Sequence, residues 1–257
     1  MGLAAGVLAG CATTERPDPL ENMNRRVFEF NDRVDKYVLV PPARLYRGVV
    51  PQPVRVGVDN FFNILNDSWS SVNLVLQGRI GDASSDAMRF SVNSVLGLGG
   101  LLDWGSELGL EPHREDFGQT LGRWGFEPGA YLVLPVLGSS TVRDVIGLPI
   151  DLKASPDQIA RAVSARNTLS AVRIVNTRAG LLSATDLLDD IALDRYTFVR
   201  DAYLQRRRSL VHDGEPPDEE RGDDVGASPQ PPAVAAGTPA AAPPEAAASA
   251  PRAPSPP

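Results

Sequence analysis

Apolar residues recur every three or four positions near the start of the chain, which is the spacing of one face of an α-helix. The stripe consists of Leu20, Met23, Val27, Phe30, Val34 and Tyr37. Asp18 is expected to cap this helix, with Pro19 at the first helical position and Glu21 as the reciprocal partner of the cap. The pattern predicts one amphipathic helix from about residue 18 onward.

Two further segments predict helices by the same reasoning. Ser155 and Pro156 form a second capping sequence, which predicts a helix through residues 156–163. In the last segment the residues of one stripe are Tyr196, Val199, Tyr203 and Leu210. Outside that stripe, Arg200, Arg207 and Arg208 are interpreted as a solvated basic face, and Gly214 as the stop of the helix.

Strand signals are weak by comparison. The short apolar runs YLVLPVLG and NLVLQG could each be a strand, but Pro135 interrupts the first, and neither has a hairpin partner with turn chemistry. The sequence therefore predicts an all-α fold, or a mostly helical one.

The composition changes at Gly214. From there to Pro257 the chain has no aromatic residue and is dominated by Ala, Pro and Ser, so it cannot bury enough apolar surface to offset the entropy of ordering. We expect a disordered tail over residues 214–257 and a folded domain over residues 18–213. The tail holds most of the net charge of −7, and the nearly neutral body lacks the basic patch of a nucleic-acid binder.

The other end of the chain predicts a lipid anchor. Cys11, the only cysteine, directly follows a run of small apolar residues, as in the lipobox of a bacterial lipoprotein signal peptide. We expect residues 1–10 to be that signal peptide and residues 11–17 a lipidated linker. The run is short and has no Lys or Arg, so a start further upstream remains an alternative. Ala12 in place of Asp favours export to the outer membrane.

The stretch NSVLGLGGLLDWGSELGL, residues 93–110, alternates glycine with leucine. It does not fit a phosphate-binding loop, because Leu102 stands where the dinucleotide motif needs its last small residue and no lysine is near. It is also too short to cross a bilayer, since Asp103 and Glu107 interrupt it. Two interpretations remain, a buried core segment or a segment lying in lipid.

Candidate chemistry for an enzyme is sparse. Only His113 and His212 could serve a Ser-His-Asp site, and the sequence around Ser140 ends in Val142 where a nucleophile elbow needs glycine. The run EPHRED has one histidine among carboxylates, which lacks the two-histidine spacing of a zinc helix and favours a surface ion-pair cluster. We expect no catalytic residue, no metal site and no cofactor.

Several blocks of the sequence occur in the order found in one family. They are DPLENMNRRVFEFNDRVDKY, VPQPVRVGVDNFFNIL, VNLVLQG, NSVLGLGGLLD, EDFGQTLGRWG, LPVLGSSTVRDVIG and DRYTFVRDAYLQRR. Together they resemble the MlaA (VacJ) family of outer-membrane lipoproteins, from Asp18 to about Arg208. One departure is Ala130, where the family usually has proline, which loosens the local turn.

The resemblance implies a single ring-like helical domain with an amphipathic channel, anchored by lipid in the outer membrane beside a trimeric porin. Its function would be to remove mislocalised phospholipids from the outer leaflet and pass them to a periplasmic MlaC-like carrier, which maintains lipid asymmetry without an enzymatic step. The alternative is a scaffold lipoprotein that binds a porin and moves no lipid.

The resemblance also suggests site residues. The candidates for contact with acyl chains or the channel are Leu96, Leu98, Leu101, Leu102 and Trp104. The candidates for a mobile channel-side loop are Gly118, Gly122, Gly125, Gly129 and Gly138, which are expected to interrupt a helix between Phe117 and Gly138. A packed, irregular connection is the open alternative for that loop.

Overall fold

The computed structural model describes residues 18–214. These residues belong to the first of two compact units, Met1–Pro217. The predictions for the signal peptide, Cys11, the linker and the Pro/Ala-rich tail lie outside the described residues. Within them, helices predominate and a single two-stranded sheet is present, so the mostly helical prediction is confirmed.

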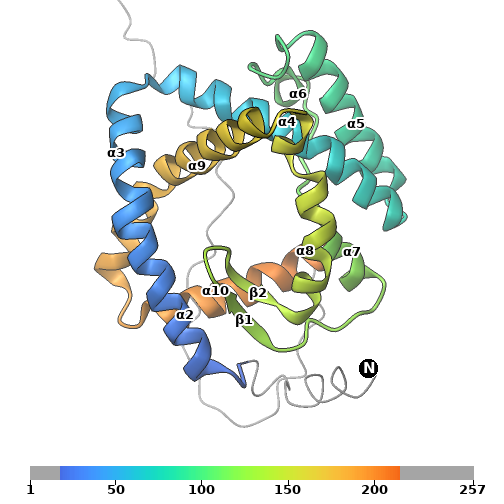
Figure 1. The fold of residues 1–257 in the computed structure, drawn as a ribbon. Helices are drawn as coiled ribbons and strands as arrows, with labels where there is room; N and C mark the ends of the chain where they lie inside the picture. Colours follow the sequence, from blue (N-terminus) through green and yellow to red (C-terminus); the bar gives the residue numbers. More distant parts are fainter. Residues whose placement is uncertain (1–17, 215–257) are drawn as a thin grey trace, which may run out of the picture. The chain divides into compact units, whose positions relative to one another are not determined.

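The first three elements form one continuous rod. Helix α2 (Glu21–Val34) runs into a π-helical turn, η1 (Asp35–Leu39), and then into α3 (Val40–Val49) (Figure 1). Two prolines at the start of α3 remove backbone donors, which accounts for the change from α to π hydrogen bonding just before them. The predicted cap is wrong, because Leu20 holds the cap position without a side-chain bond and Asp18 instead accepts from Asn24 Nδ2 at 2.8 Å.

The next helices form the upper part of the ribbon in Figure 1. They are α4 (Gln52–Leu76), α5 (Ile80–Val95) and α6 (Trp104–Glu107). Helices α4 and α5 pack along each other and are joined by a turn at Gly78, whose φ of 79° is in the region that favours glycine. The run NLVLQG therefore ends helix α4 and does not form a strand.

Helix α7 (Phe117–Arg123) leads into a β-hairpin that the sequence did not predict. Strand β1 (Tyr131–Leu134) pairs antiparallel with β2 (Gly138–Thr141), so that Tyr131 faces Thr141. Pro135 lies in the turn between the strands, not inside one. Val136 and Gly138 take left-handed φ values of 67° and 86°, which closes the hairpin without a recognisable turn dipeptide.

Four helical elements complete the unit. They are α8 (Val142–Ala154), the 3₁₀ turn η2 (Pro156–Ile159), α9 (Val163–Ile191) and α10 (Arg195–Val211). The capping sequence at Ser155 starts only the 3₁₀ turn, and the long helix begins later, at Val163. The last helix is confirmed. Its cap is Asp194, and Gly214 follows its end, donating to the carbonyl of Ser209 at 2.8 Å.

The contacts between these elements form a closed circuit. The circuit passes from α2 through η1 and α3 to α9, then through α4, α7, α8 and the hairpin strands β2 and β1 back to α2. In Figure 1 the corresponding ribbons follow one another in a ring, with α5 and α6 outside it. Elements distant in the sequence, such as α3 and α9, are therefore direct neighbours.

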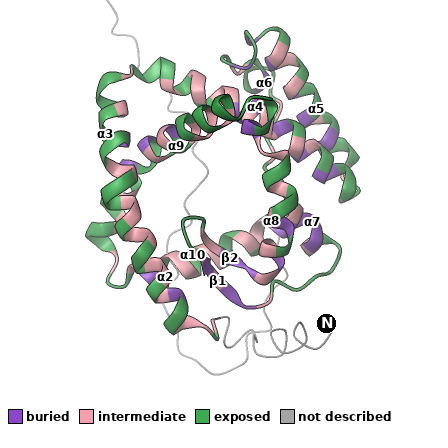
Figure 2. Ribbon diagram, viewed as in Figure 1, coloured by how far each residue is buried: buried purple, intermediate pink, exposed green. Residues whose placement is uncertain are grey.

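The distribution of polarity is the reverse of that in a water-soluble domain. Buried polar and charged residues are about as numerous as buried apolar ones, while exposed large apolar side chains outnumber both groups. Within residues 18–214 two small apolar clusters are buried, one around Ala43, Ala179 and Leu182 and one around Tyr131, Val133 and Tyr196. Figure 2 shows exposed residues on every helix of the ring.

Arg207 is the centre of an ionic cluster in the interior. Its two Nη atoms lie 2.5 Å from the oxygens of Asp116, before α7, and its Nε lies 2.9 Å from Asp144 in α8. Tyr203 also donates to Asp144, at 2.7 Å. The prediction of a solvated basic face is therefore wrong for Arg207, whose side chain is 12% exposed.

These contacts also shift the protonation equilibria of the cluster. Burial acts to lower the pKa of Arg207, but its hydrogen bonds and charge interactions with Asp116 and Asp144 outweigh burial and raise it. Burial acts to raise the pKa of Asp144, and Arg207 and Tyr203 lower it below its ordinary value. Both groups are therefore charged over the whole range in which proteins function.

We predict that Arg207→Leu strongly destabilises the fold, because it leaves the buried Asp144 without its main counter-charge. Breaking a buried ion pair from one side costs roughly 3–5 kcal/mol. Thermal unfolding of the full-length protein in detergent, followed by circular dichroism, measures the loss. The matched control is Arg206→Leu, at an exposed position, which should change stability by less than about 0.5 kcal/mol. Equal effects of the two substitutions would contradict the role assigned to the cluster.

Candidate functional site

The Gly/Leu segment forms a compact series of turns between α5 and α6. The amides of Gly99 and Gly100 donate to the carbonyls of Ser94 and Asn93, at 3.1 and 2.9 Å, and the amide of Leu102 donates to the carbonyl of Gly97 at 3.0 Å. These bonds fold the backbone back onto the end of α5. The segment is therefore an ordered surface loop, and a rigid one because its own amides are satisfied locally.

Two glycines in this loop are required by close packing. A Cβ atom at Gly97 would lie 2.3 Å from the carbonyl oxygen of Leu102, and one at Gly100 would lie 2.5 Å from Cγ2 of Ile64 in α4. Gly100 also has a φ of 94°. The alternation of glycine and leucine thus lets the loop lie directly on α4, while its leucines point elsewhere.

A buried polar network connects the Gly/Leu loop to helices α4 and α5. Arg89 of α5 donates to the carbonyl of Leu110 at 2.6 Å and contacts Asp103 at 3.2 Å and Asp67 of α4 at 3.4 Å. Asn93 donates to Asp103 at 2.9 Å and accepts from the amide of Gly105 at 2.7 Å. Both ends of the segment are therefore tied to α4 and α5 by charged and amide groups.

Burial raises the pKa of Asp67 to about 6, although Arg89 acts in the opposite direction. The neighbouring Asp86 adds to the increase, because two carboxylates disfavour each other's charge. Asp103 behaves differently: burial acts to raise its pKa, and hydrogen bonds from Ser106 and Asn93 lower it overall. The network thus contains one carboxyl group that can titrate near neutral pH.

The loop presents its large side chains outward. The exposed fractions are 58% for Leu96, 71% for Leu98, 47% for Leu101, 49% for Leu102 and 45% for Trp104. The interpretation of this segment as buried core is therefore wrong for these five side chains. Leu98 also has a left-handed φ of 54°, unfavourable for leucine, so the loop holds an exposed apolar residue at some conformational cost.

The five glycines between Phe117 and Gly138 were predicted to interrupt a helix, and this is wrong for the first two. Gly118 and Gly122 do not interrupt a helix; they lie inside α7. A Cβ at Gly118 would lie 2.5 Å from Asp144 Oδ1, and one at Gly122 would lie 2.7 Å from Arg143 Nη1. Both glycines are therefore needed for close packing against the ionic cluster.

The remaining three glycines do lie outside helices. Gly125, Gly129 and Gly138 have φ values of 91°, 67° and 86°, and nothing lies within 4 Å of a Cβ placed at Gly125 or Gly138. Gly125 and Gly129 precede the hairpin and Gly138 begins its second strand, and the hairpin turn projects toward the inside of the ring of ribbons in Figure 1. A channel-side role for these three residues stays a prediction.

Asparagines of α2 fasten the hairpin. Asn24, fully buried, donates to the carbonyl of Tyr131 at 2.9 Å and accepts from the amide of Val133 at 2.9 Å. Asn31 makes the same pair of bonds to the carbonyl of Leu134 and the amide of Val136, at 2.9 and 2.7 Å. Sequence reasoning missed both asparagines, which lie seven residues apart at the edge of the predicted apolar stripe, because the stripe was assigned from apolar residues alone.

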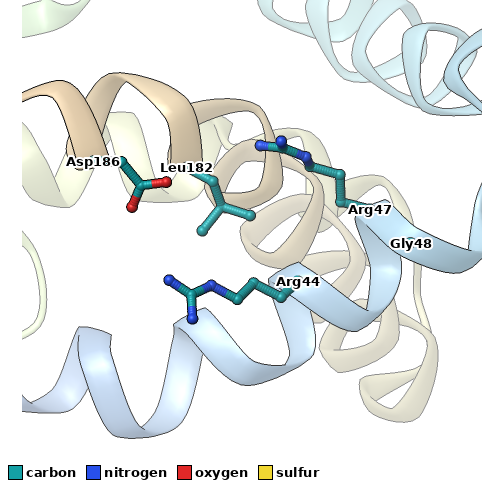
Figure 3. Close-up of a pocket in the computed structure, with 5 residues that line it drawn as sticks. All are labelled: Arg44, Arg47, Gly48, Leu182 and Asp186. Carbon is teal, nitrogen blue, oxygen red and sulfur yellow. The ribbon is translucent and has the colours of Figure 1, made fainter.

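The described residues contain two cavities lined by arginine. One, of about 310 Å³, lies between α3 and α9 (Figure 3). The other, of about 270 Å³, lies beside α10, and its lining includes Arg114, Arg206 and Arg207. Neither was predicted, since the arginines of each cavity come from different elements or from a helix face that the sequence pattern does not distinguish.

His113 belongs to an ion-pair cluster. Its Nδ1 lies 3.0 Å from Asp86 and its Nε2 3.9 Å from Asp82. Residues 18–214 hold no group of three His, Cys, Asp or Glu side chains arranged for a metal ion. In the same residues, no helix combines the length and the apolar character that a membrane crossing requires.

Comparison with known proteins identifies the family. A family model described as MlaA lipoprotein matches residues 16–210. The chain belongs to the MlaA lipoprotein family. It is 36% identical over 225 residues to the intermembrane phospholipid transport system lipoprotein MlaA of Haemophilus influenzae, covering 82% of this chain and 89% of that one. The Escherichia coli K12 protein of the same name is 35% identical over 228 residues, covering 84% of this chain and 88% of its own.

A solved structure agrees with this assignment. It comes from work on the structural basis for maintenance of bacterial outer membrane lipid asymmetry and is 38% identical, with a TM-score of 0.66. It covers 76% of this chain and 100% of its own. The MlaA resemblance inferred from the sequence blocks is confirmed, and so is the mostly helical fold.

The packing of the Gly/Leu loop gives one prediction. Gly100→Ala should destabilise the protein more than Gly99→Ala, although both residues have a positive φ, because only a Cβ at Gly100 meets Ile64. We expect an additional loss of about 1–3 kcal/mol, the usual cost of overpacking. Thermal unfolding of both variants in detergent tests this, and equal losses would show that the loop does not rest on α4.

Asp67 gives a pH-dependent prediction. Its unfolded carboxyl group loses its proton near pH 4 and the folded one near pH 6, so folding stability falls as the pH rises through that window. Asp67→Asn removes the titration. The stability of the variant relative to the natural protein should therefore increase between pH 4 and 7, by the order of 1–2 kcal/mol. Melting temperatures measured at each pH test this, and a constant difference would contradict it.

Proposed function

We propose that this protein removes mislocalised phospholipids from the outer leaflet of a Gram-negative outer membrane and passes them to a periplasmic lipid carrier. The observation that carries the proposal is the reversed polarity of the fold, with apolar side chains outside and polar networks inside. An apolar exterior suits a protein lying in hydrocarbon. Its MlaA relatives are named for intermembrane phospholipid transport, which supports the same assignment.

The proposed passage is amphipathic and lies within the ring of helices. A phospholipid crossing a bilayer alone must move its charged headgroup through hydrocarbon at high cost, and polar side chains along the way lower that cost. Polar groups suited to this role bridge α4 and its neighbours: Asn176 of α9 donates to Asp59 at 2.6 Å, and Arg114 donates to Asn63 at 3.0 Å.

Spare hydrogen-bonding capacity in the same region supports this assignment. The Oη of Tyr46 and the Nε of Arg55 are buried and have no hydrogen-bond partner in the described part of the chain, so both can bind a polar group or water that enters. Burial raises the pKa of Asp59, which is the direction expected for a carboxyl group withdrawn from bulk water. Such groups assist movement without breaking a covalent bond, and we propose that the protein has no catalytic activity.

The anchor and partners complete the proposal. Lipid attached to Cys11 would hold the protein in the outer membrane, where several acyl chains give durable attachment. A trimeric porin is the proposed neighbour, and an MlaC-like carrier the proposed acceptor of the lipid. The scaffold alternative keeps the anchor and the porin but moves no phospholipid.

The primary test measures phospholipid at the cell surface with a membrane-impermeant amine label. A deletion strain should regain low labelling when it expresses the natural gene, but not when it expresses Cys11→Ala. If labelling stays high while the natural protein reaches the outer membrane and co-purifies with a porin, the scaffold function replaces lipid removal.

The Gly/Leu loop is the proposed contact with acyl chains, and charged substitutions test it. Leu98→Asp and Leu101→Asp should raise surface labelling toward the deletion level, because a charge placed at membrane depth costs about 2–3 kcal/mol. The control is Leu193→Asp, at a fully exposed leucine outside the loop. If the Leu98→Asp and Leu101→Asp variants fold and give normal labelling, the loop has no role in lipid removal.

A further inference from the structure

The cavity between α3 and α9 brings together two arginines and one carboxylate. Its lining consists of Arg44, Arg47 and Gly48 from α3 and Leu182 and Asp186 from α9. In Figure 3 the guanidinium of Arg44 and the carboxylate of Asp186 point toward the space between the helices, and Arg47 extends over the same space from the next turn. The wall is therefore charged with both signs.

Ion pairs compensate these charges only in part. Within the described residues, Arg44 and Asp186 form no hydrogen bond or salt bridge, and Arg47 donates to Ser183 Oγ at 3.0 Å. The pKa of Arg178 is raised chiefly by its hydrogen bonds to Asp35, at 2.6 Å, and further by the charge of the nearby Asp186. The cavity thus keeps two cations and one anion available, on opposite helices.

A ligand that satisfies this set must itself carry both charges. A phosphate group matches the planar, multi-donor guanidinium groups, and an ammonium group matches a carboxylate. The wall contributed by Leu182, which is 4% exposed, is apolar and suits a short hydrocarbon link between the two charges. A volume of about 310 Å³ is at the lower end of the range for small-molecule sites.

Gly48 keeps the cavity open. Nothing lies within 4 Å of a Cβ placed on it, although it lines the cavity from inside helix α3. A glycine within a helix lowers helix stability relative to other residues, so no local folding reason favours it here. A larger side chain is therefore free of clashes at its Cβ, and it would add bulk at the cavity lining.

We propose that this cavity binds the zwitterionic headgroup of an ethanolamine phospholipid, with its phosphate on Arg44 and Arg47 and its ammonium on Asp186. The proposal rests on the proposed function and adds a headgroup preference to it. An anionic phosphatidylglycerol would present the phosphate without the ammonium. It would bind less well, because Asp186 would then repel it.

The test measures which lipid stays with the protein. Full-length protein is reconstituted into vesicles of equal amounts of phosphatidylethanolamine and phosphatidylglycerol, then extracted in mild detergent, and the bound lipids are quantified by mass spectrometry. The natural protein should retain an excess of phosphatidylethanolamine. Asp186→Asn should reduce the ratio of the two lipids about fivefold, and Arg44→Ala and Gly48→Leu should reduce the total bound lipid.

Matched controls separate the cavity from general changes in charge. Asp190→Asn removes a carboxylate one turn further along α9, and Arg33→Ala removes an exposed arginine of α2. Neither lines the cavity, so both should retain the natural ratio and amount. If the three cavity variants also keep natural values, or the controls fall with them, the assignment of the site is wrong.

Competition distinguishes a headgroup from a free phosphate. O-phosphoethanolamine should displace bound lipid from the natural protein, and inorganic phosphate at the same concentration should displace much less. Equal displacement by both would overturn the headgroup assignment in favour of a phosphate site. The surface-labelling assay tests the proposed function independently. If the natural gene lowers surface labelling but the cavity variants keep the natural lipid ratio, only the headgroup inference is wrong.

Discussion

Arg207 joins three helices through Asp116 and Asp144, and the fold depends on contacts of this kind because apolar burial is scarce. In an ordinary domain the burial of apolar surface is the dominant favourable term. Here about half of the large apolar side chains of the described residues are exposed, and the buried apolar clusters are small. Hydrogen bonds and ion pairs in the interior must therefore define which elements are neighbours. Removing one partner is costly, since the other is left buried and unpaired.

The same networks explain how the exterior can be apolar. A water-soluble protein with this surface would aggregate, whereas in a membrane the exposed leucines and valines are already in their preferred solvent. A lower dielectric environment strengthens the interior hydrogen bonds further. The Gly/Leu loop illustrates the division: Arg89 and Asn93 hold its backbone from the buried side, and Leu98 and Leu101 point away from that network.

Local patterns in the sequence predicted part of the local structure. The apolar stripe and the stop at Gly214 agree with helix α10. The caps predicted at Asp18 and Ser155 do not begin the long helices, and the extent of α9, from Val163 to Ile191, was not predicted. The hairpin was missed because its strands are short and its turn contains none of the usual dipeptides. Its position is fixed by Asn24, more than a hundred residues away in the sequence. The family was recognisable from several sequence blocks that occur in the family's order, whereas periodicity alone revealed neither the hairpin nor its contacts.

Packing limits where this domain can move, and this bears on how a lipid could pass. Gly118 and Gly122 lie against charged side chains within α7, so that region has no free volume for a hinge. Gly125, before the hairpin, and Gly138, the first residue of β2, have open space and left-handed backbone angles. Asn24 and Asn31 each hold the hairpin to α2 through two hydrogen bonds, but Asn24 is fully buried, whereas Asn31 binds the turn at the exposed Val136. Movement of the turn beside Gly138 therefore breaks solvent-exposed hydrogen bonds before the buried ones of Asn24.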